Sequence, residues 1–406
     1  MIAQKPISLA SIFCLLVVAC DIGGRATESE YQGAVSFVDC ANTFVVSGSR
    51  KIYLFEHRPY GVEFKQLADF DDWAPLSAYL DCDANRIIAP YGARKGDRNN
   101  AGVAIIDLAT GVKSEYPLVS KGIQGIPIKY RNGILLGTTL LQRGETAPSF
   151  GYMAPGERYT DKSGENYRIY TPTVFFDLNK LQFTREFDID IGYAVLADGV
   201  LTAKQRGAIT AIDLQNKTTE VLFESPAPND SDNPVKLPMY HLNVFVDGNY
   251  YMVLNSRSYN KANFGLSGYQ SNGIYQLVDG SVVKLANIPY EDSTYLLGIE
   301  NKLYIFTSSF KAIEFDIRSK SMLEYDFSSA ISEGEYQIES VGYTNSNFII
   351  AMGNRQRDQS SKVLLVSRDF KQISAPYNLD LRLISITTNL AIDTADTRGV
   401  SLFKDR

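Results

Sequence analysis

The sequence has few of the side chains that enzymes commonly use for catalysis or metal binding. Its 406 residues include only two histidines, His57 and His241, and one tryptophan, Trp73. No Gly-x-Ser-x-Gly, Gly-x-Gly-x-x-Gly, phosphate-loop or His-Glu-x-x-His motif occurs. These absences argue against a nucleophile-elbow hydrolase, a dinucleotide-binding enzyme and a zinc hydrolase of the His-Glu-x-x-His type.

Basic charge and long apolar segments are also scarce. Forty Lys and Arg against 46 Asp and Glu give a formal charge of −6, so we expect no nucleic-acid partner. The one long apolar segment, Ile7 to Val18, is too short to span a bilayer comfortably, because spanning needs about 20 residues. We therefore expect the remainder of the chain to be soluble.

The N-terminal segment has the layout of a secretory signal. Lys5 precedes the apolar run, which ends in Val17-Val18-Ala19-Cys20 before polar, glycine-containing sequence. This stretch resembles the lipobox of bacterial lipoproteins, in which the cysteine becomes the lipidated first residue. The resemblance implies cleavage before Cys20 and its modification by palmitate or similar acyl chains. The alternative is an ordinary signal peptide or a short anchor.

Lipidation would place the mature chain outside the cytoplasm with a lipid bilayer as one partner. Several acyl chains on one cysteine suffice for stable anchoring, since each buried CH₂ contributes about 0.8 kcal/mol. Asp21 follows Cys20. By resemblance to enterobacterial lipoproteins, this implies retention at the periplasmic face of the inner membrane, with the outer membrane as the alternative.

A hairpin pattern recurs along the rest of the chain. Each copy has an alternating apolar strand, a turn with Asn or Asp, and a second apolar strand, and Asn-Gly and Asp-Gly are strong hairpin signals. Eight copies occur, over residues 35–46, 79–88, 126–136, 194–202, 243–253, 295–306, 340–350 and 383–392. A second hairpin follows each of them.

The first strand of this second hairpin often ends in Asp. The four examples are Asp107, Asp177, Asp213 and Asp316. Because Asp just before a tight turn accepts bonds from backbone N–H groups, we expect these carboxylates to be structural.

Two hairpins per unit, at a spacing of about 50 residues, resemble one blade of a quinoprotein-like or YVTN-like β-propeller. The resemblance implies an all-β fold, a single closed β-propeller of eight four-stranded blades, with seven blades as the alternative. The last blade lacks an outer strand, which an N-terminal strand near residues 25–31 would supply, closing the ring. Since the chain lacks the regular tryptophans of quinoprotein blades, the resemblance implies a fold and no cofactor.

The chain is therefore expected to have three parts. Residues 1–19 are the signal peptide, residues 20–33 a lipid-anchored tether with the closing strand, and residues 34–406 the propeller domain.

Two cysteines besides Cys20 remain in the mature chain. Val38-Asp39-Cys40 and Leu80-Asp81-Cys82 occupy the same place, at the ends of the inner strands of blades one and two. Equivalent positions on neighbouring inner strands lie close around the channel, and exported chains favour oxidised cysteines. We therefore expect a disulfide between Cys40 and Cys82, with two buried free thiols as the alternative.

The long loops are expected to share one face of the ring. Segments 91–101, 140–171, 255–272 and 354–361 join a second strand to a third, and 224–241 joins two blades. Tyrosine and arginine are common in binding hot spots. The candidate partner-binding residues on these loops are Tyr91, Arg94, Tyr152, Arg158, Tyr159, Tyr167, Tyr170, Tyr259 and Tyr269.

Metal and catalytic sites have less support. Asp230-Ser231-Asp232-Asn233 alternates oxygen ligands as calcium loops do, but it lacks their glycine and distal glutamate. Asp230 and Asp232 are therefore weak metal candidates. His57 and His241 fall on opposite faces of a propeller, so they cannot pair, and no catalytic residue is predicted.

The sequence thus favours a non-catalytic scaffold on the membrane that holds an envelope protein or glycan on its loop-bearing face. The alternative is an envelope enzyme, such as a lyase, hydrolase or dehydrogenase, with its site at the channel mouth, because propellers host many functions.

Overall fold

The structure is a computed structural model in which strands make up nearly all of the regular structure. It describes residues 27–30, 40–48, 51–58, 61–70, 73–75, 78–93, 100–119, 122–143, 158–160, 166–170, 173–187, 195–197, 200–205, 208–216, 218–224, 242–254, 273–289, 293–331, 336–354, 361–381 and 385–388. Within these ranges the one helical segment is a 3₁₀ turn at Ser328–Ala330. The predicted all-β class is confirmed.

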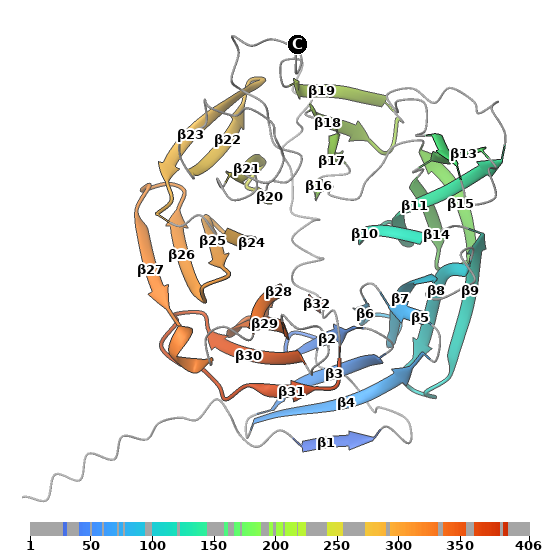
Figure 1. Cartoon of the computed structure of the whole chain (residues 1–406), viewed down its shortest axis with the longest axis horizontal. Helices are drawn as coiled ribbons and strands as arrows, with labels where there is room; N and C mark the ends of the chain where they lie inside the picture. Colours follow the sequence, from blue (N-terminus) through green and yellow to red (C-terminus); the bar gives the residue numbers. More distant parts are fainter. Residues whose placement is uncertain are drawn as a thin grey trace, which may run out of the picture.

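The described strands form seven sheets around a common centre (Figure 1). We number them along the chain as sheets 1 to 7. Sheet 1 contains β1 (Thr27–Glu30), β2 (Thr43–Ser47), β3 (Lys51–Arg58), β4 (Gly61–Asp69) and β32 (Ser385–Thr388). Sheet 2 contains β5 (Trp73–Pro75), β6 (Tyr79–Asp81), β7 (Arg86–Ala93), β8 (Asn100–Asp107) and β9 (Lys113–Val119). Sheet 3 contains β10 (Gly122–Tyr130), β11 (Gly133–Arg143), β12 (Arg158–Thr160), β13 (Asn166–Tyr170), β14 (Thr173–Asp177) and β15 (Gln182–Phe187).

The other four sheets are four-stranded antiparallel meanders in chain order. Sheet 4 contains β16 (Val195–Ala197), β17 (Val200–Gln205), β18 (Ala208–Asp213) and β19 (Thr218–Glu224). Sheet 5 contains β20 (Leu242–Val246), β21 (Asn249–Leu254), β22 (Gly273–Val278) and β23 (Ser281–Asn287). Sheet 6 contains β24 (Ser293–Ile299), β25 (Lys302–Thr307), β26 (Lys311–Asp316) and β27 (Met322–Asp326). Sheet 7 contains β28 (Tyr336–Tyr343), β29 (Asn347–Asn354), β30 (Ser361–Ser367) and β31 (Tyr377–Leu379).

Local turn chemistry explains these hairpins. Asp247 and Gly248, between β20 and β21, have φ of 47° and 74°, as a two-residue type I′ turn requires. Six of the eight predicted first hairpins form as paired strands: β6–β7, β10–β11, β16–β17, β20–β21, β24–β25 and β28–β29.

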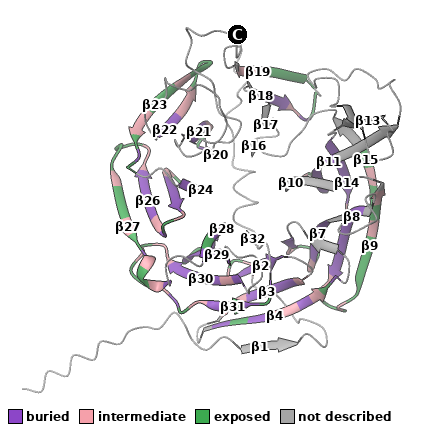
Figure 2. Ribbon diagram, viewed as in Figure 1, coloured by how far each residue is buried: buried purple, intermediate pink, exposed green. Residues whose placement is uncertain are grey.

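Apolar contacts join neighbouring sheets face to face. Alternate residues of a strand point to opposite faces, so Phe306 packs in the cluster shared with sheet 7, whereas Ile305 packs in the cluster shared with sheet 5. One further cluster joins Phe44 and Tyr53 of sheet 1 to Ile349 and Leu365 of sheet 7. Buried residues concentrate on middle strands such as β3, β26, β29 and β30, while β9, β19, β23 and β27 at the rim are exposed or half-buried (Figure 2). This is the architecture of a β-propeller.

Sheet 1 differs from the prediction at its inner edge. Residues 383–392 were expected to start an eighth blade, but β32 pairs antiparallel with β2, with Val46 opposite Ile386. It also contacts β28 and β6, the inner strands of the sheets on either side. The expected first and last hairpins thus each contribute one described strand to the same inner pair.

The N-terminal strand also lies elsewhere than expected. β1 pairs in parallel with β4, the fourth strand of sheet 1, rather than completing a sheet built on residues 383–404. Both ends of the described chain therefore belong to one sheet, with β32 at the inner edge and β1 at the outer edge.

Candidate functional site

Two kinds of turn meet on one side of the ring. The N–H of Leu178, just after β14, donates to the carbonyl of Asn132 in the β10–β11 turn at 2.9 Å. Ile317 donates to Asn301 in the same way at 3.0 Å. The turns between first and second strands and between third and fourth strands therefore share this side. We call it the turn face and define it by residues 82–85, 108–112, 131–132, 178–181, 279–280, 300–301 and 317–321.

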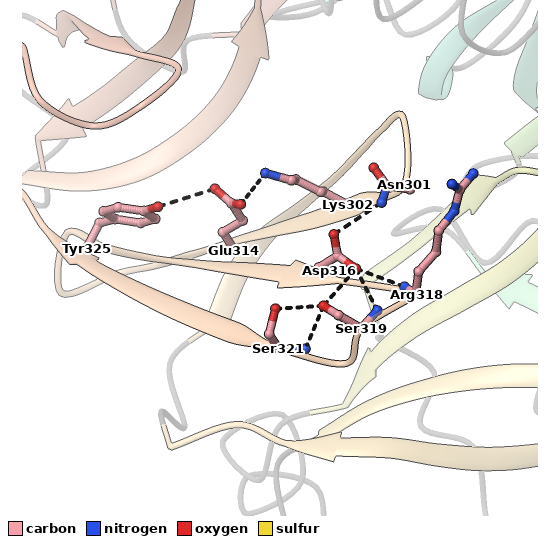
Figure 3. Close-up of polar contacts among 8 residues, drawn as sticks. All are labelled: Asn301, Lys302, Glu314, Asp316, Arg318, Ser319, Ser321 and Tyr325. Atoms are coloured by element: carbon pink, nitrogen blue, oxygen red, sulfur yellow. Dashed lines mark hydrogen bonds and ion pairs between the residues drawn. The ribbon is translucent and has the colours of Figure 1, made fainter.

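The repeated aspartates hold the turn face together. Asp316 accepts hydrogen bonds from the N–H of Ser319 at 2.7 Å, the N–H of Arg318 at 3.0 Å and Nδ2 of Asn301 at 3.1 Å (Figure 3). Asp107, Asp177 and Asp213 likewise each accept a hydrogen bond from the backbone N–H of the residue three positions later. These bonds hold the pKa of all four carboxyl groups below its ordinary value. The predicted structural role is confirmed.

A buried carboxylate that the sequence analysis did not single out lies on sheet 6. Glu314 of β26 pairs with Lys302 of β25 and accepts a 3.3 Å hydrogen bond from the hydroxyl of Tyr325 on β27 (Figure 3). The Glu314 side chain is only 11% exposed. The nearby carboxylate raises the pKa of Lys302. Burial, followed by Glu314, raises the pKa of Tyr325.

Sheet 7 closes over this carboxylate. Phe370 stacks on Tyr325 with ring centroids 4.1 Å apart. Arg368 lies 5.1 Å from the ring centroid of Phe348 and donates to the carbonyl of Thr344 at 3.3 Å. Both oxygens of Glu314 are engaged within sheet 6, so the carboxylate joins β25, β26 and β27, and Tyr325 in turn packs against sheet 7. The sequence signal was a pair of charges, Lys302 and Glu314, inside apolar strands.

Tyr91 is part of the core, which corrects its assignment as a partner-binding residue. It is 2% exposed and packs between sheets 1 and 2. A Cβ at Gly102, its cross-strand neighbour, would lie 2.5 Å from the Tyr91 hydroxyl, so only glycine leaves room for the ring. Burial raises the pKa of Tyr91 to about 12. The alternating pattern of β7 could have indicated this, since Tyr91 shares a face with Ile87 and Ala89.

Four other candidates lie on a β-ribbon that extends sheet 3. The first half of β11 pairs with β14, whereas Leu140 to Arg143 pair with β13. β12 then pairs with β13, so the expected loop 140–171 contains three paired strands. Register places Tyr159 opposite Tyr167 and Arg158 opposite Arg168, while Tyr170 lies opposite Leu140. We call β12, β13 and residues 140–143 the ribbon.

Several predicted sites lie outside the described residues. They are Cys20, Arg94, Tyr152, Asp230, Asp232, Tyr259 and Tyr269, and the second histidine, His241, also lies outside the described residues. Within the described ranges, no three His, Cys, Asp or Glu side chains gather as metal ligands. The part of the chain that the structure describes has no helix with the length and hydrophobicity needed to cross a membrane.

Cys40 and Cys82 form a disulfide with their Cα atoms 6.2 Å apart. Both cysteines pack against the core between sheets 1 and 2. The bridge therefore joins the chain just before β2 to the turn just after β6, on the turn side of the molecule.

His57 lies near the end of β3, where its backbone N–H donates a hydrogen bond to the carbonyl of Asn42 at 2.9 Å. Its Nε2 is buried and has no hydrogen-bond partner among the described residues. Burial lowers the pKa of His57. A neutral imidazole in this position fits a packing role.

Comparison with known proteins gives fold resemblance alone. No protein-family model matches the chain, and no curated protein matches it. A solved oligogalacturonate lyase in complex with manganese is 13% identical, covering 79% of this chain and 85% of its own, with a TM-score of 0.50. A puromycin hydrolase is 8% identical over 86% of this chain and 56% of its own, also with a TM-score of 0.50.

A quinoprotein alcohol dehydrogenase-like protein from Bacteroides thetaiotaomicron is 12% identical, covering 90% of this chain and 97% of its own, with a TM-score of 0.44. At such identities a common fold says nothing of a common activity. The chain is therefore similar to these proteins as a β-propeller and in no finer respect.

Proposed function

We propose that this protein is a lipid-anchored scaffold of the bacterial envelope, which binds a protein or glycan partner through the ribbon. We further propose that its ring has seven blades and that β32 closes it as the inner strand of the first blade. The observation that carries the function is the continuation of β11 beyond its blade to pair with β13.

The ribbon is an addition to the repeating unit. Among the described residues, sheets 4 to 7 contain four strands each and no such extension. The extra pairing therefore serves something other than closing the ring. Backbone register places Arg143, Tyr167 and Tyr159 in one row across three strands. Tyrosine offers large contact area at low entropic cost and a hydroxyl for polar partners, so such a row suits protein or glycan recognition.

The anchor is proposed from the Val17-Val18-Ala19-Cys20 stretch, with retention at the inner membrane from Asp21. Replacing Cys20 by alanine should abolish labelling with a palmitate analogue and release processed protein from membranes or leave the precursor uncleaved. Normal lipid labelling of Cys20→Ala would refute the anchor.

Paired ribbon variants test the binding role. Tyr159→Ala with Tyr167→Ala should leave the folded ring intact and remove most crosslinked partners from whole envelopes or most retention on an envelope glycan. The control is Lys180→Ala, a 75% exposed position on the turn face. An unchanged set of partners in the ribbon variant, with wild-type stability, would show that the ribbon is not the binding surface.

The enzyme reading remains the second candidate because a lyase and a hydrolase share this fold at a TM-score of 0.50. It would place the site at the channel mouth. Turnover of an envelope glycan by purified protein, unaffected by the ribbon variants, would favour it over the scaffold.

A further inference from the structure

The attachment of β1 fixes where the tether meets the ring. β1 runs parallel to β4, with Thr27 opposite Glu63 and Glu30 opposite Gln66. β4 begins at Gly61, which pairs with Arg58 across the turn between the third and fourth strands. Because the two strands run in the same direction, β1 also begins at this turn. The tether therefore enters sheet 1 on the turn face.

The tether is short. Thr27 lies seven residues after Cys20, so a fully extended chain spans at most about 25 Å between them. An acylated Cys20 therefore lies within about 25 Å of Thr27, which sits near the turn end of sheet 1.

A second, independent observation concerns exposed apolar side chains. Isolated ones are ordinary on protein surfaces, but those of the described residues are not scattered. Each lies within three residues of a turn between the third and fourth strands of its sheet. They are Val112 (59% exposed), Leu181 (38%), Val278 (39%), Val283 (44%) and Leu323 (55%), from sheets 2, 3, 5 and 6.

Lysines accompany several of these apolar side chains. Lys113 follows Val112, Lys180 precedes Leu181, and Lys320 lies three residues before Leu323. An apolar side chain with a neighbouring lysine suits the headgroup boundary of a bilayer, where the apolar group enters and the ammonium stays at the phosphates.

We propose that the turn face rests against the lipid bilayer, so that the ring is anchored with its loop-bearing side directed away from the membrane. This inference rests on the proposed anchor at Cys20. β11 begins at Gly133, next to the turn face, and reaches the ribbon only at its far end, Leu140 to Arg143. The ribbon would therefore stand on the side of the ring that faces a partner in the periplasm.

Site-specific fluorescence quenching tests the orientation. Arg318→Cys and Ser329→Cys place a dye at exposed positions before and after β27, on the turn face and on the opposite side of sheet 6. Full-length lipidated protein is reconstituted in vesicles of phosphatidylethanolamine and phosphatidylglycerol carrying a headgroup quencher. The bridge between Cys40 and Cys82 and the acylation of Cys20 leave the introduced thiol for labelling.

The dye at position 318 should lose most of its fluorescence and the dye at position 329 little. Equal quenching, or stronger quenching at 329, in protein that floats with the vesicles would overturn the orientation while leaving the anchor in place. Protein that fails to float would overturn the anchor and the orientation together. An unquenched dye at 318 on floating protein would likewise overturn the orientation.

The apolar side chains are tested in the same assay. The triple variant Val112→Ser, Leu181→Ser and Leu323→Ser changes only exposed positions, so the fold should persist. It should still float but lose part of the quenching at position 318. Unchanged quenching would refute their contact with the bilayer.

Discussion

Asn132 donates a 2.9 Å hydrogen bond to the carboxylate of Asp177, a residue 45 positions later in the chain. The bond ties the β10–β11 turn to the end of β14. Asn301 and Asp316 repeat it in sheet 6 at 3.1 Å. In sheets 3 and 6 this Asn–Asp hydrogen bond therefore joins two turns of the same sheet. Because the acceptor is a carboxylate, the bond also bears on how the fold responds to acid.

Acid should weaken the fold through the four aspartates that accept backbone N–H bonds at the ends of third strands. Each aspartate accepts a hydrogen bond from the backbone N–H of the residue three positions later. This bond is the main cause that lowers the pKa of Asp107, Asp177, Asp213 and Asp316. A carboxyl group whose pKa is lower in the folded state contributes stability above its unfolded value and loses it as pH falls through the folded value. The urea midpoint should therefore decline below about pH 4.

Asp177→Asn tests the contribution of one of these carboxylates. The amide still accepts hydrogen bonds but carries no charge, so the variant should be less stable than wild type at pH 7. The difference should shrink as pH falls, because the wild-type carboxylate is then protonated. Asp83→Asn, at an exposed turn position, is the control. A difference for Asp177→Asn that stays constant from pH 7 to pH 3 would contradict the mechanism.

Loss of the disulfide should destabilise the contact between sheets 1 and 2. The bridged cysteines are 42 residues apart, and a loop of that length corresponds to about 4 kcal/mol in the chain-entropy model. The double variant Cys40→Ser, Cys82→Ser should show a comparable fall in unfolding free energy. Thiol alkylation provides the direct check, since both cysteines should resist modification in denatured, unreduced protein.

Removing β32 should open the ring. Truncation after residue 382 exposes the edge of β2 and removes its pairing with residues 385–388, at about 1 kcal/mol for each lost backbone hydrogen bond. The truncated protein should unfold at lower urea and aggregate through the open edge. A truncation after residue 390, which retains β32, should keep the wild-type midpoint. Equal behaviour of the two truncations would refute closure by β32.

The buried carboxylate of Glu314 should be important for the stability of sheet 6. Glu314→Ala leaves the ammonium of Lys302 and the hydroxyl of Tyr325 without their acceptor, at a cost of about 1–3 kcal/mol. A double-mutant cycle with Lys302→Met measures the pair separately from packing losses. Additive effects in the cycle would show that the two charges do not stabilise each other.

Local sequence patterns determined most strands and turns. Asp247-Gly248 has one good solution, a two-residue turn with positive φ, and it forms as expected. The aspartates that end third strands were likewise readable, because their bonds go to N–H groups two and three residues away. Such interactions depend on a few adjacent residues and need no knowledge of the rest of the chain.

Strand partners were decided only by the tertiary structure. The apolar alternation of residues 383–392 fits the first strand of any blade, and it was therefore expected to start a new one. A strand pattern specifies a period of two but no partner. The structure pairs Ile386 with Val46, 340 residues earlier in the chain.

The same limit explains the side chains that were assigned wrongly or missed. Tyr91 was taken for a loop residue, yet β7 continues through it and the absent side chain of Gly102 opens the space that its ring fills. Glu314 was missed because its partners Lys302 and Tyr325 come from the two neighbouring strands, and only the sheet brings the three side chains together. The order of residues determines which positions are apolar and where the chain turns, whereas burial and pairing depend on which strands and sheet faces the fold brings together.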